Sequence, residues 1–391
     1  MLDSQPTDRA SLSVCTIMVF FRKNPSWKRR THRFHRGVDV RMVNELWDEV
    51  HLADLAYSDT IDALRDGLDQ ARKKWELVYF EPFSEPGRPS HFIALRKGQS
   101  KWNSTLDIVF AVRGTKDAKD LITDSLMHPV EYRGGLAHDG IVKSGKYLCD
   151  KHTELLKDLV KLSGKKKINL SMIGHSLGAA SAAVAGIELN EIEEFDVKVT
   201  CFGCPPILSR DLSEKYKGIV KTVINDADCI PRMSGATIAN VAMAIMEYDY
   251  TPYARRDAEQ VLNELQFNAS TLFTKSDVTR AMDFIDSAID DYIRPALTPN
   301  NIAKRVEPVL FPPGLCIHFY RDGRAISGSL APCTFFSEID VSRTMLDDHL
   351  IKNGYRRLFL DLMRHYHDDD NFTFYAGDVD LKSEARETCT P

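Results

Sequence analysis

A serine stands between two glycines in the stretch "IGHSLGAASA", with Gly174 two residues before Ser176 and Gly178 two residues after it. The apolar run "INLSMIG" is typical of a buried strand, and the small residues after the serine are typical of a helix. A serine at such a junction lies on a sharp turn that exposes its hydroxyl, where the helix N-terminus favours developing negative charge. The pattern predicts a nucleophile elbow made of Gly174, His175, Ser176 and Gly178.

A serine hydroxyl becomes a strong nucleophile only when a histidine takes its proton and a carboxylate orients that histidine. In chains with serine on such a turn, the acid and then the histidine follow it in sequence. The strand expected over "GIVKTVIN" is followed by Asp226 and Asp228, and both are candidate acids. His349 is the candidate base, because it follows an acidic turn after the expected strand "TFFSEI".

The other histidines downstream of Ser176 are less suitable. His318 lies inside the apolar run "GLCIHFYR", which predicts a strand position. His365 and His367 stand beside three aspartates in "HYHDDD", which we interpret as a loose surface tail and not as a metal site. No metal and no cofactor are expected.

The elements that must position these residues alternate along the chain. Helices are expected over 38–73, over 139–163 and from Ser176 onward. Strands are expected in "WELVYFEPF", "HFIALR", "LDIVFAVRG", "KINLSMIG", "KVTCFG" and "GIVKTVIN". This alternation predicts an α/β fold whose mostly parallel central sheet carries helices on both faces. Ligands of such sheets bind at the carboxyl ends of the strands.

Composition excludes several classes of protein. The 391 residues are 43% hydrophobic, and the formal net charge of −5 gives no field that would gather nucleic acid. The apolar run at 13–21 is far shorter than the roughly 20 residues of a membrane span. Its positive charges follow it, so we expect no secretory signal. The eight cysteines, including the Cys201-Phe-Gly-Cys204 pair, are interpreted as reduced structural thiols of a cytoplasmic protein.

We expect three parts along the chain. Residues 1–37 form a basic arm, in which "FRKNPSWKRRTHRFHRG" concentrates Lys and Arg between positions 22 and 36. This arm is either a solvated tail or a peripheral contact with an anionic membrane, at about 1 kcal/mol for each basic residue near the bilayer. Residues 38–370 form the main domain, with a helical insertion at about 250–305, and residues 371–391 form a C-terminal tail.

The chain resembles the class 3 lipases in five successive stretches, "DIVFAVRGTKDAKDLITD", "AHDGIVKSG", "IGHSLGAASA", "CFGCPP" and "DCIPR". Within that family, "FPPGLCIHFYR" followed by "SRTMLDDHL" looks most like the sn-1-specific diacylglycerol lipases. The resemblance implies the α/β-hydrolase fold. It also implies a serine hydrolase that cleaves acyl esters of glycerolipids, diacylglycerol or triacylglycerol, through an acyl-enzyme.

The resemblance also implies a role for each candidate residue. Ser176 would be the nucleophile and His349 the general base. Asp228 would be the acid, because Cys-Ile-Pro-Arg follows it as in the family, with Asp226 as the alternative.

Family members also have an oxyanion hole and a lid. By resemblance, the backbone N–H groups of Leu177 and Thr115 form the oxyanion hole. The stretch after Thr115 either covers the site or packs in the core; its apolar residues are Leu121, Ile122, Leu126, Met127 and Val130. The insertion at 250–305 occupies the place of a regulatory loop in the diacylglycerol lipases.

Three other functions fit the same residues. The same triad serves a phospholipase A1 or galactolipase, or an esterase of small esters, because acyl preference depends on the lid and groove. The third is a lipase-fold interaction protein whose triad is silent. The complete set of triad residues argues against this last interpretation.

Overall fold

The computed structural model describes residues 38–100, 102–115, 129–247, 308–322 and 325–367, and isolated positions between 259 and 283. The basic arm, the C-terminal tail and most of the insertion at 250–305 lie outside these ranges. The chain divides into two compact units, residues 27–235 with 308–391, and residues 1–26 with 236–307. The first unit contains the sheet. In the second, α8 (Gly235–Glu247) is described along its backbone.

In the described part of the chain, the central sheet has eight strands in the order β1-β2-β3-β6-β7-β8-β9-β10. Neighbours in the middle of the sheet pair in parallel: β3 (Thr105–Val112), β6 (Lys167–His175), β7 (Phe195–Phe202), β8 (Val220–Asn225) and β9 (Leu315–Asp322). Antiparallel strands complete both edges: β1 (Trp75–Glu81), β2 (His91–Arg96) and β10 (Ala325–Ala331). The predicted mostly parallel sheet is therefore confirmed.

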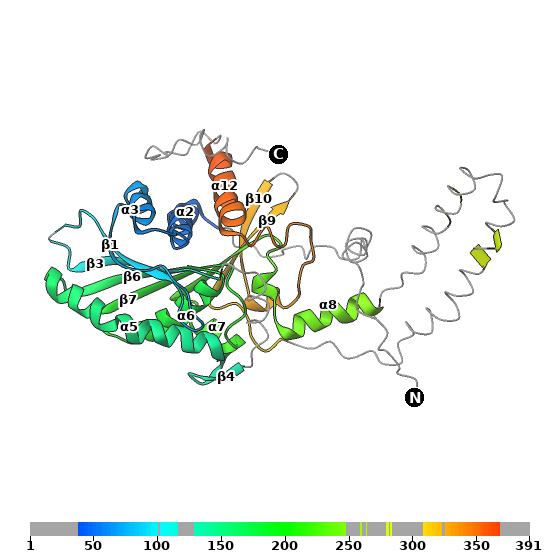
Figure 1. Cartoon of the computed structure of the whole chain (residues 1–391), viewed down its shortest axis with the longest axis horizontal. Helices are drawn as coiled ribbons and strands as arrows, with labels where there is room; N and C mark the ends of the chain where they lie inside the picture. The colour runs from blue at the N-terminus through cyan, green and yellow to red at the C-terminus, as the bar shows by residue number, and fades with distance from the viewer. Residues whose placement is uncertain are drawn as a thin grey trace, which may run out of the picture. The chain divides into compact units, whose positions relative to one another are not determined.

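Helices cover both faces of this sheet (Figure 1). One face carries α2 (Val40–Leu55), α3 (Ile61–Gln70) and α12 (Arg357–His367). The other carries α5 (Asp139–Ser163), α6 (Leu177–Leu189) and α7 (Arg210–Lys215). Shorter elements are the hairpin β4 (Pro129–Tyr132) and β5 (Gly135–His138), the 3₁₀ turns η1 (Ile230–Arg232) and η3 (Cys333–Phe336), and the π-helical η4 (Ile351–Arg356).

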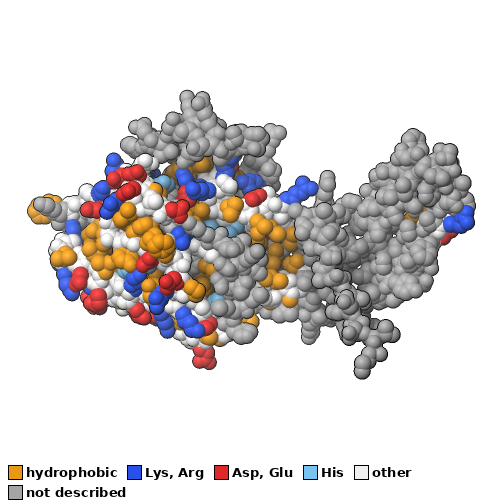
Figure 2. All heavy atoms as spheres, viewed as in Figure 1, with side chains coloured by type: hydrophobic (Ala, Val, Ile, Leu, Met, Phe, Trp, Pro, Cys, Tyr) orange, Lys and Arg blue, Asp and Glu red, His pale blue; other side chains and the backbone are white. Residues whose placement is uncertain are grey.

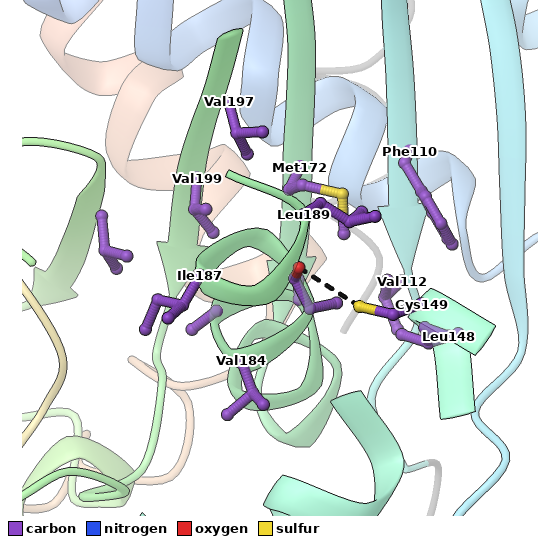
Figure 3. Packing of buried hydrophobic residues seen from close by; sticks show 14 of the residues in the cluster. Phe110, Val112, Leu148, Cys149, Met172, Val184, Ile187, Leu189, Val197 and Val199 are labelled. Atoms are coloured by element: carbon purple, nitrogen blue, oxygen red, sulfur yellow. Dashed lines mark hydrogen bonds between the residues drawn. The ribbon is translucent and has the colours of Figure 1, made fainter. Parts of the chain in front are cut away.

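Strand β3 shows how the sheet supplies two cores. Phe110 and Val112 point into the layer under α5 and α6, whereas Val109 and Ala111 point into the layer under α2, because successive strand side chains alternate between faces. Figure 3 shows the first layer, in which Leu189 of α6 lies beside Met172 of β6 and Val184 points away from the strands toward α5. The other residues of α6 are mostly alanine and glycine, so the helix lies close to the strands and holds the strand ends firmly.

Two local predictions are wrong. No strand forms over "TFFSEI", because β10 ends at Ala331 and Pro332, which has no N–H to donate, begins the turn η3. The stretch "HYHDDD" is not wholly a loose tail, since α12 continues through His367 before the described residues end. His318 lies in β9, as predicted.

Charged side chains of both signs are interspersed on the face of the larger unit seen in Figure 2. Hydrophobic side chains also gather in several areas of that face. Short ion pairs of the described residues include Arg133 with Glu188 at 2.8 Å and Lys143 with Asp139 at 2.6 Å. Among the described helices, none is long and apolar enough to cross a membrane.

A buried pair of histidines joins β2 to α5. The Nε2 atoms of His91 and His152 are 2.7 Å apart, and His91 Nδ1 is 2.7 Å from the Pro89 carbonyl. Because that carbonyl only accepts, His91 carries its proton on Nδ1 and accepts the bond that His152 donates. Burial lowers the pKa of His91 to about 4 and that of His152 to about 3, so both stay neutral near pH 7.

We expect this pair to make the protein sensitive to acid. Both histidines take up a proton on unfolding once the pH falls below about 6.5, so the free energy of unfolding decreases from there toward pH 4 by up to about 1.4 kcal/mol per pH unit for each. Urea unfolding between pH 4.5 and 7.5 measures this slope. His152→Gln, which keeps a donor but cannot be protonated, should flatten it, and an unchanged slope would contradict the assignment.

Candidate active site

Ser176 lies between the end of β6 and the start of α6 with φ 59° and ψ −131°. A non-glycine residue adopts such a conformation at a cost of about 1–3 kcal/mol, and strain of this kind is concentrated at functional sites. A Cβ atom on Gly174 would lie 2.6 Å from the backbone of Ala179, and one on Gly178 would collide with the backbone of Arg113. Both glycines are therefore required by the tight crossing of the turn, as the pattern predicts.

The structure brings Ser176, Asp228 and His349 together. His349 Nε2 is 3.0 Å from Ser176 Oγ, and His349 Nδ1 is 3.1 Å from each carboxylate oxygen of Asp228. The serine follows β6, the aspartate follows β8 and the histidine precedes η4, so all three lie at the carboxyl edge of the parallel strands. Their exposed fractions are 2%, 0% and 8%, respectively. These distances allow direct proton transfer from the hydroxyl to the imidazole.

Asp228 is held as a carboxylate. Burial by itself would raise its pKa, but the neighbouring His349 and hydrogen bonds outweigh that effect and hold the pKa below its usual range. Tyr355 donates its hydroxyl to Oδ2 at 2.6 Å, and the Ile230 N–H donates to Oδ1 at 2.9 Å. A buried acceptor with its lone pairs used in this way keeps one orientation, with its oxygens toward the imidazole.

Asp226, the alternative acid, lies in a different environment. Its backbone has φ 40°, and its carboxylate is 3.6 Å from Arg321 of β9. Arg321 also lies 3.5 Å from Asp348, the residue before His349. Burial raises the pKa of Asp348 to about 6. These charges connect the loop after β8 with the loop that carries His349.

The proposed oxyanion residues lie on both sides of the serine. Leu177 is the first residue of α6, so its N–H has no carbonyl four residues earlier in the helix to bind. Gly114, directly before Thr115, packs so tightly against the elbow that a Cβ atom there would lie 2.9 Å from Ser176 Cβ. Of the five apolar residues predicted for the lid, only Val130 is described, and it packs in hairpin strand β4 against the core. The other four apolar lid residues lie outside the described ranges.

Gly203 is a residue of this site that the sequence pattern did not single out. It has φ 60°, and a Cβ atom there would lie 2.9 Å from both Asp228 Oδ2 and His349 Nδ1. Any side chain would enter the space where the acid meets the base. The sequence offers one weak signal, a glycine directly after the strand neighbouring β6.

Gly203→Ala should lower kcat by about 10- to 100-fold, because displacing a catalytic pair by about 1 Å costs up to about 10². The initial rate of hydrolysis of a chromogenic short-chain ester measures the effect. Gly218→Ala is the matched control, since a Cβ atom at Gly218 has no neighbour within 4 Å. Equal activity of the two variants would show that the pair tolerates the added methyl group.

Parts of the chain are similar in sequence to known proteins. The sequence model described as lipase (class 3) matches residues 109–238, which include Ser176 and Asp228. This part of the chain is similar to the class 3 lipases. Diacylglycerol lipase-beta of Mus musculus is 32% identical over 149 residues, 36% of this chain and 22% of that protein. Diacylglycerol lipase-alpha of Rattus norvegicus is 24% identical over 314 residues, 73% of this chain and 28% of that protein.

The chain spans about a quarter of the length of the curated relatives it matches. Among solved structures, it is similar to a lipase from Rhizopus microsporus var. chinensis, with a TM-score of 0.50 and 14% identity over 84% of this chain and 92% of that chain. At that identity the likeness concerns the fold. Together with the sheet order, it confirms the predicted α/β-hydrolase fold.

Cysteines and possible metal ligands were the other candidates for chemistry. Cys201 and Cys204 are buried free thiols, and burial raises the pKa of Cys204 further above its ordinary value, so it stays protonated. In the described ranges, no group of three or more His, Cys, Asp or Glu residues could hold a metal ion.

Two exposed leucines flank the base. Leu346 is 59% exposed and Leu350 is 45% exposed, three residues before His349 and one after it. Cys229 and Ile230, next to the acid, form a small apolar cluster against which Leu177 and Met345 pack. Apolar side chains therefore flank the acid and the base both at the surface and in the core.

Proposed function

We propose that this protein is a serine hydrolase that cleaves acyl esters of glycerolipids, with diacylglycerol as the first candidate substrate. The observation that carries the proposal is the hydrogen-bonded series Ser176, His349 and Asp228 on a strained elbow. The match of residues 109–238 to the class 3 lipases supports the same reaction class.

In the proposed reaction, Ser176 Oγ attacks the acyl carbonyl carbon while His349 Nε2 accepts the hydroxyl proton. Asp228 orients the imidazole and stabilises its charged form. The backbone N–H groups of Leu177 and Thr115 would bind the carbonyl oxygen as it becomes negative, each contributing about 3 kcal/mol. The glyceride alcohol leaves with the proton from His349, and water then hydrolyses the ester on Ser176 by the same steps.

Two observations favour a glycerolipid over a small ester. The diacylglycerol lipase-alpha match extends over most of this chain and not only around the elbow. Leu346 and Leu350 also present apolar surface beside His349, which suits acyl chains and is costly to leave in water. A phospholipase A1, a galactolipase or an esterase of small esters would use the same three residues.

A substrate panel tests this proposal. The purified protein is assayed on diacylglycerol, triacylglycerol, phosphatidylcholine, a galactolipid and a short chromogenic ester, before and after treatment with a fluorophosphonate. We expect turnover of diacylglycerol. We also expect complete inhibition when one fluorophosphonate is attached to each protein molecule, on the peptide that contains Ser176. No turnover and no label would favour a silent lipase-fold protein. Turnover with the label on another serine would refute the assignment of Ser176.

We also propose that the basic arm, residues 22–36, gives peripheral contact with an anionic membrane on the cytoplasmic side. The arm lies outside the described residues, so the argument rests on its charge. Replacing Arg29, Arg30 and Arg33 with Glu should abolish most cosedimentation with vesicles that contain 30% phosphatidylserine, because each basic residue contributes about 1 kcal/mol near the surface. Activity on the soluble ester serves as the control, and unchanged cosedimentation would refute the contact.

A further inference from the structure

His175, the residue before the proposed nucleophile, joins two parts of the site. Its Nδ1 atom is 2.8 Å from the hydroxyl of Tyr57, and its Nε2 atom is 2.7 Å from the backbone carbonyl oxygen of His349. The His175 and His349 rings lie side by side, with centroids 4.7 Å apart and planes 32° apart. His175 therefore touches the backbone of the base, while Ser176 touches its imidazole.

The direction of each hydrogen bond can be assigned. A carbonyl oxygen only accepts, so His175 Nε2 carries a proton and donates it to His349. Burial, and then the neighbouring His349, lower the pKa of His175 to about 3, so its ring is neutral at ordinary pH. In a neutral imidazole the other nitrogen is an acceptor, so Nδ1 accepts the hydroxyl proton of Tyr57.

Tyr57 extends this series to the oxyanion side. Burial raises the pKa of the Tyr57 phenol well above its ordinary value, so the group stays protonated. The nearby backbone N–H of Gly114 lowers that pKa in part. Gly114 directly precedes Thr115, and a Cβ atom on Gly114 would lie 2.8 Å from Tyr57 Oη and 2.6 Å from the His175 carbonyl.

We propose that Tyr57 and His175 are positioning residues that hold the oxyanion loop, the elbow and the base in one arrangement. The two hydrogen bonds run in one direction, from Tyr57 to His175 and from His175 to the His349 carbonyl, and Gly114 packs against the Tyr57 hydroxyl. The His349 carbonyl makes His175 its donor, and this makes Tyr57 the donor to His175, so loss of one member frees both of its neighbours. This inference rests on the proposed function and deepens it, because it assigns two residues that act on the reaction through others.

These hydrogen bonds join segments that are distant in sequence. Tyr57 follows α2 and lies 118 residues before His175, which lies 174 residues before His349. All members are buried or partly buried, and phenylalanine and leucine would fill the same volumes without a polar atom. A protein that needed only packing here would avoid the cost of burying a phenol and an imidazole. The hydrogen bonds therefore explain these residue types better than packing does.

The test compares Tyr57→Phe, His175→Leu and His175→Gln with the wild type. The short chromogenic ester gives kcat and KM, and urea unfolding gives stability. We expect Tyr57→Phe and His175→Leu each to lower kcat by about 10- to 100-fold with KM within about twofold. The double variant should be no slower than the slower single variant, because the series of hydrogen bonds is already broken in each single variant. His175→Gln, which can donate and accept, should recover at least half of the lost rate on a logarithmic scale.

Tyr132→Phe is the matched control, because it removes a buried hydroxyl that donates to Glu188 at 2.7 Å outside the site. It should lose stability and keep kcat. Wild-type kcat in Tyr57→Phe and His175→Leu, or additive losses in the double variant, would overturn the inference while leaving the proposed function intact. A wild type that neither hydrolyses the ester nor reacts with fluorophosphonate at Ser176 would instead overturn the proposed function and the inference with it.

Discussion

Ser176→Ala is expected to lower kcat for ester hydrolysis by about 10⁵- to 10⁶-fold, the loss typical of removing the nucleophile of a serine hydrolase. The variant keeps the elbow but has no oxygen within 3.0 Å of His349 Nε2 to attack the ester. It should also fail to react with a fluorophosphonate. Rates on the chromogenic ester and intact-protein mass measure both effects.

Ser181→Ala is the control for that experiment. Ser181 is a buried serine one turn further along α6, whose hydroxyl is 2.7 Å from that of Ser144. It should react with the fluorophosphonate as the wild type does and keep kcat within about threefold, since one neutral hydrogen bond contributes about 1 kcal/mol to stability and none to the reaction. Residual turnover in Ser176→Ala above one part in 10³ would mean that another residue attacks the ester.

Asp228→Asn is expected to lower kcat by about 10⁴-fold, the effect seen when the acid of such a triad becomes an amide. The asparagine would fill the same space, but its NH₂ group cannot accept the hydrogen bond that His349 Nδ1–H donates. The histidine would then take the tautomer with its proton toward Ser176, where it cannot act as a base. A pH–rate profile on the chromogenic ester separates this loss of base strength from unfolding.

Asp226→Asn is the matched variant, since it makes the same change two residues away. Its carboxylate faces Arg321, so we expect a loss of less than about tenfold, through weaker attachment of the loop that carries His349. The reverse order, with Asp226→Asn the slower variant, would transfer the acid role to Asp226.

Local sequence was enough to predict the elbow. A strand, a turn and a helix within about 20 residues fold largely by their own periodicity, and the glycines around Ser176 are needed by contacts within the turn. The same reasoning predicted α5 and the parallel strands, since alternating apolar runs depend on neighbours in sequence. It was wrong at "TFFSEI", where a proline ends the ladder although the side chains favour a strand.

Tertiary structure decided the rest. From the residue pattern, either Asp226 or Asp228 could be the acid. Only the turn after β8, with φ 40° at Asp226, directs the Asp226 carboxylate to Arg321 and the Asp228 carboxylate to His349. Tyr57 and Gly203 were not predicted at all. Tyr57 acts through His175, 118 residues later, and Gly203 lies against Asp228 and His349. Contacts between segments that are separated in this way leave no period or spacing in the sequence.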